Sequence, residues 1–143
     1  MTVPMRLLGI DPGARRVGVA LSDEDARIAM PLCTLAVRGQ QELTEALAAL
    51  VEEHQVATVV VGLPLRLDGG ESESSRKARS LAAALGQRVA ALVVLWDERL
   101  STTQAERALR EGGTRGRDKR ALVDQVAAAL ILQSYLDSRA THG

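Results

Sequence analysis

Three acidic residues occupy positions where a carboxylate is unusual. Asp11 ends a strongly apolar run and precedes Pro-Gly, Glu98 follows a second apolar run, and Asp124 lies within the most apolar helical stretch. A carboxylate beside core residues is costly unless a partner or a cation neutralises its charge. Converging carboxylates suit Mg²⁺ or Mn²⁺, and two such ions can promote phosphodiester hydrolysis. The three acids therefore predict a two-metal site that cleaves nucleic acid.

Each acid also has a simpler interpretation. Asp11 could form an Asx-turn before Pro-Gly, and Glu98 could pair with a surface arginine. Asp124 could lie on a narrow polar stripe of its helix with Gln125 or Arg120. Asp97 adds an ambiguity, because adjacent strand residues point to opposite faces and only one of this pair is expected to reach the metals. Strand alternation by itself does not choose between Asp97 and Glu98.

A basic stretch runs from Arg107 to Arg120, with six basic residues against two acidic ones. Lys+Arg and Asp+Glu both number 18, so the overall charge indicates no particular partner. The basic residues that directly precede the helix of Asp124 are predicted to hold substrate phosphates beside the metals; they are Arg115, Arg117, Lys119 and Arg120. A solvated loop is the competing interpretation.

The rest of the composition excludes several classes of protein. The single cysteine rules out an intramolecular disulfide and a Cys-rich zinc site, and it fits a reducing cytoplasm. Two histidines are too few to favour a Ser/His/Asp arrangement, and 1% aromatic residues argues against a base-stacking module. No signal-peptide pattern or membrane-length apolar run is found, so we expect one cytoplasmic domain spanning residues 1–143.

Hydrophobic periodicity predicts the elements that position the acids. Strands are expected at 5–11, 17–21, 28–37, 57–63 and 89–96. Helices are expected at 42–54, at 74–85 with Gly86 ending it, from the capping box at 101–104 to Gly112, and at about 119–137. Short early turns favour antiparallel pairing, and helical connections favour parallel pairing. The pattern predicts an α/β fold with a mixed five-stranded sheet, three antiparallel strands and then two parallel ones, and helices on both faces.

Four parts of the chain, read together, resemble the YqgF/RuvX family. They are Gly9–Gly13 with Val17–Asp23, Val61–Pro64 with Asp68–Gly69, Asp97–Thr102, and Asp124–Ala128 with Ile131–Leu136. The resemblance covers nearly the whole chain. It implies a ribonuclease H-like fold related to the RuvC resolvases, and a nuclease that matures the 5′ end of pre-16S rRNA in the bacterial cytoplasm. Some members resemble Holliday-junction resolvases instead. The family's acidic triad falls on Asp11, Glu98 and Asp124, which selects Glu98 over Asp97.

The same resemblance extends the set of expected nucleic-acid contacts. Arg15 and Arg16 stand where many members carry Lys-Arg, and we also expect Arg99 to contact the substrate. The expected partners are RNA, branched DNA and ribosomal precursor particles, bound by a monomer or by a homodimer that would supply two symmetric sites.

Two other functions compete with a nuclease. A phosphotransferase of the actin or sugar-kinase type needs two such domains around a nucleotide, and 143 residues supply one. A non-catalytic RNA- or ribosome-binding module would keep the acids as relics, and it would show no carboxylate-dependent site in a titration with Mn²⁺.

Overall fold

The fold is built around one mixed sheet. The computed structural model describes residues 5–103 and 117–142, and in the last helix the side chains of 120–140. The strands are β1 (Arg6–Pro12), β2 (Arg16–Ser22), β3 (Ala29–Ala36), β4 (Val56–Leu63) and β5 (Leu92–Asp97), in the spatial order β3-β2-β1-β4-β5. The first three strands pair antiparallel, and β4 pairs parallel with both β1 and β5. The predicted pairing is confirmed.

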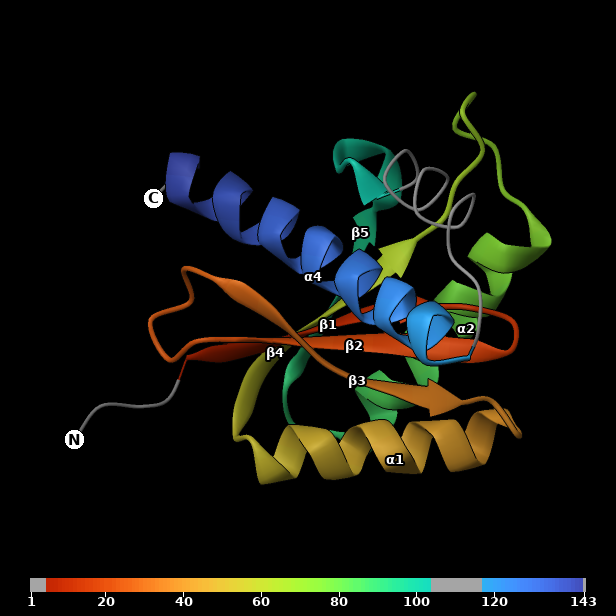
Figure 1. The fold of residues 1–143 in the computed structure, drawn as a ribbon, viewed down its shortest axis with the longest axis horizontal. Helices are drawn as coiled ribbons and strands as arrows, with labels where there is room; N and C mark the ends of the chain where they lie inside the picture. Colours follow the sequence, from red (N-terminus) through yellow and green to blue (C-terminus); the bar gives the residue numbers. More distant parts are fainter. Residues whose placement is uncertain (1–4, 104–116, 143) are drawn as a thin grey trace.

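Helices cover both faces of this sheet, as predicted (Figure 1). Helix α4 (Arg117–His142) crosses one face, and α1 (Gln40–Glu53) and α2 (Glu73–Arg88) cover the other. Each face has its own apolar core: Ile131 and Leu132 of α4 pack on one side, and Leu47 of α1 and Leu85 of α2 pack on the other. Among the described residues, no helix is long and apolar enough to cross a membrane.

Several element boundaries differ from the predictions, most of them by one or two residues. Helix α2 continues past Gly86 to Arg88, because the burial of Leu81 and Leu85 outweighs the roughly 1 kcal/mol cost of a glycine inside a helix. Strand β5 begins at Leu92 rather than residue 89, and it ends at Asp97. Helix α4 is longer than predicted at both ends.

The sequence predicted that Glu98 lies at the end of a strand, and this prediction is wrong. Glu98 opens a short 3₁₀ helix, η1 (Glu98–Leu100), directly after β5. The helix expected after the capping box at 101–104, and most of the basic stretch from Arg107, lie outside the described residues.

Candidate active site

The side chain of Asp11 points toward α4. On β1, Leu8 and Ile10 belong to the core beneath α1 and α2, and Leu7 belongs to the core beneath α4. Successive side chains of a strand point to opposite faces, so Asp11 shares the face of Leu7. Asp11 is buried, with 4% of its surface exposed. A carboxylate therefore lies under α4 near the carboxyl end of the strand that is central in the sheet.

Helix α4 brings Asp124 to the strand beside Asp11. The register partner of Asp11 on β2 is Gly18. A Cβ atom on Gly18 would overlap the backbone oxygen of Asp124, so the helix and the strand touch backbone to backbone at this position. Asp124 is itself buried. The missing side chain of Gly18 is what allows the last helix to set its acid next to β1.

Glu98 reaches the same region from the other side of Asp11. Strand β4 lies parallel to β1 with Val61 opposite Ile10, so Gly62 lies beside Asp11. A Cβ atom on Gly62 would lie 2.9 Å from Oε1 of Glu98. Glu98 is 1% exposed, and both of its carboxylate oxygens are shielded from solvent. The two glycines that flank Asp11 thus leave room for Glu98 on one side and Asp124 on the other.

The closeness of α4 to β2 makes Gly18 sensitive to substitution. Gly18→Ala is expected to lower the free energy of unfolding by about 3 kcal/mol, because the methyl group collides with the backbone of α4 and forces the helix away. Gly39→Ala is the matched control, since no atom lies within 4 Å of a Cβ there, and it should change stability by less than about 1 kcal/mol. Urea unfolding of both variants is the measurement. Wild-type stability in Gly18→Ala would contradict the close contact.

The side chain of Asp97 makes different contacts from that of Glu98. Its carboxylate accepts hydrogen bonds from the backbone N–H of Arg99 at 2.9 Å and from the Arg99 guanidinium, with Nη2 2.7 Å from Oδ2. The guanidinium holds the pKa of Asp97 below its ordinary value. Asp97 therefore pairs with Arg99 and caps the turn that follows β5. The 3₁₀ turn, rather than strand alternation, separates Asp97 from Glu98.

One interaction of Asp124 was not predicted. Nε of Arg16, at the start of β2, lies 2.6 Å from Oδ2 of Asp124. The sequence had indicated Arg16 as a nucleic-acid contact and had offered only Gln125 or Arg120 as a polar neighbour of Asp124. The two residues are 108 positions apart, and no local pattern in the sequence could have paired them.

The acids fit a divalent cation in the kind of donor they offer. Asp11, Glu98 and Asp124 supply buried carboxylate oxygens, which are the ligands that Mg²⁺ and Mn²⁺ prefer. In the part of the chain that the structure describes, no three Asp, Glu, His or Cys side chains surround one point closely enough to hold a metal ion. The hold of Arg16 on Asp124 is the contact that a cation would have to replace.

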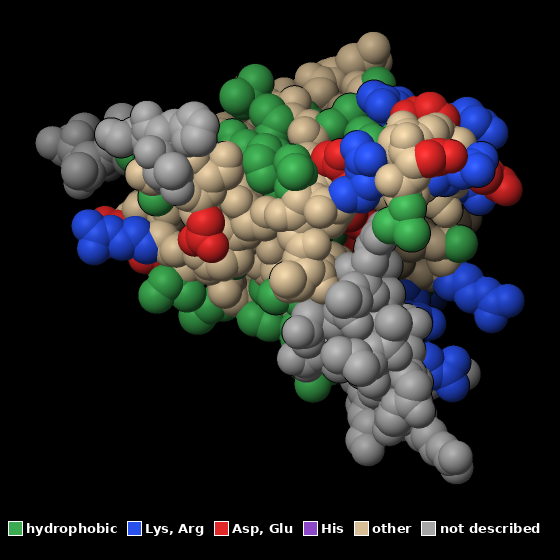
Figure 2. Space-filling view, turned by 90° about the horizontal axis from the view of Figure 1, so that it is seen from above, with side chains coloured by type: hydrophobic (Ala, Val, Ile, Leu, Met, Phe, Trp, Pro, Cys, Tyr) green, Lys and Arg blue, Asp and Glu red, His purple; other side chains and the backbone are tan. Residues whose placement is uncertain are grey.

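The other arginines predicted to bind nucleic acid are differently placed. Arg15 and Arg120 are exposed, while Arg99 is engaged with Asp97 and with the backbone oxygen of Leu67. Arg115 lies outside the described residues, as do the side chains of Arg117 and Lys119. Figure 2 shows Lys and Arg side chains concentrated at the end of the molecule that carries the β1–β2 turn and the start of α2.

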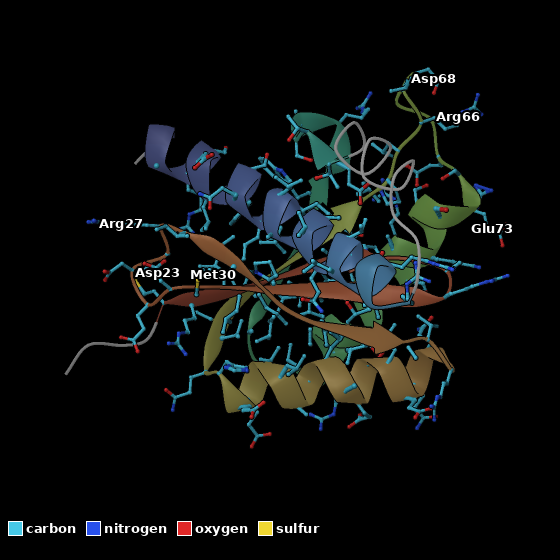
Figure 3. All side chains as sticks on the ribbon, viewed as in Figure 1. Asp23, Arg27, Met30, Arg66, Asp68 and Glu73 are labelled. Atoms are coloured by element: carbon cyan, nitrogen blue, oxygen red, sulfur yellow. The ribbon has the colours of Figure 1, made fainter. Side chains whose placement is uncertain are left out.

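The connection between β4 and α2 forms a closed turn at this same end. The N–H of Arg66 donates to the oxygen of Gly70 at 3.0 Å, and the N–H of Gly70 donates to Oδ1 of Asp68 at 2.8 Å. Figure 3 shows Arg66 and Asp68 at its tip, far from Asp23 and Arg27 at the opposite end of the molecule. This turn adds Arg66 to the exposed basic groups at this end of the molecule.

Sequence relatives point to one family. The family described as "RuvX: Holliday junction resolvase" matches residues 5–138. A protein of Anaeromyxobacter sp. (strain Fw109-5) named "Putative pre-16S rRNA nuclease" is 47% identical over 135 residues, covering 94% of this chain and 98% of that protein. A protein of Mycobacteroides abscessus with the same name is 44% identical over 136 residues, covering 94% of this chain and 82% of that protein.

A solved structure shares the fold. RuvC of Thermus thermophilus, in complex with a Holliday junction substrate, matches with a TM-score of 0.62 at 15% identity, over 95% of this chain and 96% of that chain. This likeness confirms the predicted ribonuclease H-like fold. Because the family match spans nearly the whole chain and the sequence relatives align over most of it, this chain belongs to the RuvX family.

Proposed function

We propose that this chain is a metal-dependent nuclease that hydrolyses phosphodiester bonds, and that it matures the 5′ end of pre-16S rRNA in the bacterial cytoplasm. The observation that carries the proposal is that Asp124 and Glu98 lie against Gly18 and Gly62, the two glycines that flank Asp11 on the α4 face of the sheet. The name of the sequence relatives supports the choice of substrate. Precursor ribosomal particles are the corresponding partner.

Asp11, Glu98 and Asp124 are the residues that would hold one or two Mg²⁺ or Mn²⁺ ions. Such ions, when bound, lower the pKa of a water molecule and offset the charge of a phosphate. The chain itself keeps the carboxylates of Asp11 and Glu98 out of bulk water. Electrostatic interactions are stronger in such a shielded site than in water. The packing of α4 on β2 fixes the position of Asp124. Exposed arginines at the same end, such as Arg15 and Arg66, are placed to contact the substrate backbone.

Arg16 links substrate binding to the acids. Its guanidinium neutralises Asp124 in the present arrangement, and it can instead bind a phosphate oxygen when substrate arrives. Arg16→Gln is expected to lower the free energy of unfolding without metal by about 1 kcal/mol, a modest value because the Arg16 side chain is 36% exposed. The same change should tighten Mn²⁺ binding about five-fold, since the cation no longer competes with Arg16.

Arg15→Gln is the matched control for Arg16, because Arg15 is the exposed neighbour in the same turn. Calorimetric titration with Mn²⁺ and urea unfolding are the measurements. Equal Mn²⁺ affinity in Arg16→Gln, Arg15→Gln and the wild type would show that Arg16 does not restrain Asp124.

Cleavage of a Holliday junction is the second candidate, favoured by the description of the family and by the fold shared with RuvC. A panel of single-stranded RNA, structured pre-16S rRNA and a four-way DNA junction, each with and without Mn²⁺, separates the two. We expect metal-dependent cleavage of the pre-16S rRNA near its mature 5′ end. Cleavage confined to the junction would instead favour a resolvase, and this activity calls for a dimer because two symmetric cuts need two sites.

A non-catalytic RNA-binding module would give a different result in the same panel. It would bind the rRNA precursor without cutting it, and titration with Mn²⁺ would show no site that depends on Asp11 or Asp124. Metal binding that is lost in Asp11→Asn would exclude such a module.

A further inference from the structure

A cavity of about 510 Å³ lies beside Glu98, lined by the end of β1 and the turn after it, the start of β2, the first turn of α1 and the first half of α2. Its apolar lining includes Pro12, Val17, Leu43 and Leu81. Val17, Leu43 and Leu81 belong to the core under α1 and α2, so the floor of the cavity is part of that packed core. Pockets for small ligands are commonly about 300–1,000 Å³ with mostly apolar walls, and this cavity is of that kind.

The cavity borders the candidate active site at Glu98, the one of the three acids that contributes to its lining. The carboxylate of Glu98 also lies over Gly62, which is the neighbour of Asp11 across the β1–β4 pair. A polymer held at the acids can therefore extend one of its groups into the cavity without leaving the site.

The rim of the cavity carries polar groups suited to a nucleotide. Oε1 of Gln40 accepts a hydrogen bond from Ser80 at 3.1 Å, and this contact orients the amide. Nζ of Lys77 lies 3.4 Å from Glu73 on the same helix, and both side chains are largely exposed. An exposed pair of this kind contributes little to stability, so Lys77 can exchange Glu73 for a phosphate at small cost. An apolar slot with an amide and an ammonium group at its mouth matches a flat base attached to a phosphate.

We propose that this cavity receives the base of a nucleotide adjoining the cleaved phosphodiester bond, which deepens the proposed function and rests on it. The walls are aliphatic: the only aromatic residues of the chain, Trp96 and Tyr135, lie in the core on the other face of the sheet. The base is therefore held by the shape of the cavity and by the rim, not by aromatic stacking. A base can enter only when it is unpaired, so the site selects flexible or single-stranded nucleic acid over continuous duplex.

The test compares cleavage of an intact RNA with cleavage of RNAs that lack one base at either nucleotide beside the cut. For the wild type, removal of one of these bases should lower kcat/KM about ten-fold. Ala14→Phe fills the cavity from an exposed position on its lining and should cause a similar loss on intact RNA. In Ala14→Phe, removal of the base should cause no further loss of kcat/KM, because both changes remove the same contact.

Ala83→Phe is the matched control, since Ala83 is exposed on α2 and does not line the cavity. It should keep the wild-type rate and the full effect of the missing base. If the wild type cleaves intact and base-depleted RNA equally, the cavity proposal is wrong while the nuclease function stands.

Binding measurements keep the test decisive even when nothing is cleaved. The affinity for a short single-stranded RNA is measured by fluorescence anisotropy without metal, for the wild type, Ala14→Phe and Ala83→Phe. We expect about ten-fold weaker binding by Ala14→Phe alone. If no nucleic acid is cleaved, the proposed function fails, and equal affinity in all three proteins would overturn the cavity proposal as well.

Discussion

Asp11→Asn is expected to lower the rate of phosphodiester cleavage by at least about a thousand-fold, the order expected when a group acting directly on developing charge is removed. Asn has the shape of Asp but lacks the anionic charge that holds a divalent cation. Asp11 is central among the three acids, because Gly18 and Gly62 flank it and bring Asp124 and Glu98 to either side. Its substitution should therefore also weaken Mn²⁺ binding, which calorimetric titration measures.

The fold of Asp11→Asn should survive, because the change removes a buried charge without changing volume. Its free energy of unfolding without metal should equal or exceed that of the wild type. Asp25→Asn, an exposed substitution in the turn between β2 and β3, is the control and should leave both turnover and stability unchanged. Wild-type turnover in Asp11→Asn would remove Asp11 from the site.

Glu98→Gln should cause a loss of the same order, whereas Asp97→Asn should retain cleavage within a few-fold. The carboxylate of Glu98 is buried over Gly62, near Asp11. The carboxylate oxygens of Asp97, its neighbour in the chain, accept hydrogen bonds from the N-terminus of η1 and from the guanidinium of Arg99. Parallel measurement of turnover and Mn²⁺ affinity in the two variants decides between them. Loss in Asp97→Asn with retention in Glu98→Gln would reverse the assignment.

Asp97→Asn should instead lower stability in a pH-dependent way. The loss of the charge pair with Arg99 should cost about 1 kcal/mol at neutral pH, while the side-chain oxygen of Asn can still cap η1. Because Arg99 lowers the pKa of Asp97 in the folded protein, the stabilising contribution of the carboxylate is present above its ordinary pKa of 3.8. It is lost as the pH falls below this value and through the folded pKa. The difference in unfolding free energy between wild type and variant should therefore shrink in acid, and a constant difference would contradict the ion pair.

Local patterns in the sequence determined the architecture of this protein. The apolar runs that form β1, β2 and β4 predicted buried strands, because burial of continuous apolar segments depends on neighbours in the chain. Turn lengths then fixed which strands pair antiparallel and which pair parallel. The acids Asp11 and Asp124 stood out for the same local reason, since each interrupts an apolar run.

The ends of the helices and strands were harder to predict from the sequence. Gly86 predicted the end of α2, but the packing of Leu85 carries the helix further. Asp97 and Glu98 were both interpreted as strand residues. Asp97 is the last residue of β5, and its capping of η1 turns the chain at Glu98. In both cases a tertiary or capping contact of about 1 kcal/mol or more outweighed the local propensity.

Only the tertiary structure decided how the acids are surrounded. The contact of Gly18 with α4, the room over Gly62 for Glu98, and the hold of Arg16 on Asp124 each join positions far apart in the chain. The cavity beside Glu98 is likewise lined by residues of β1, β2, α1, α2 and η1. Hydrophobic periodicity indicates which face of a helix or strand a residue occupies. The distance between a helix and the sheet depends instead on how closely their backbones pack. This distance is set by glycines and by long-range ion pairs, and it becomes defined only when the helices have docked on the sheet.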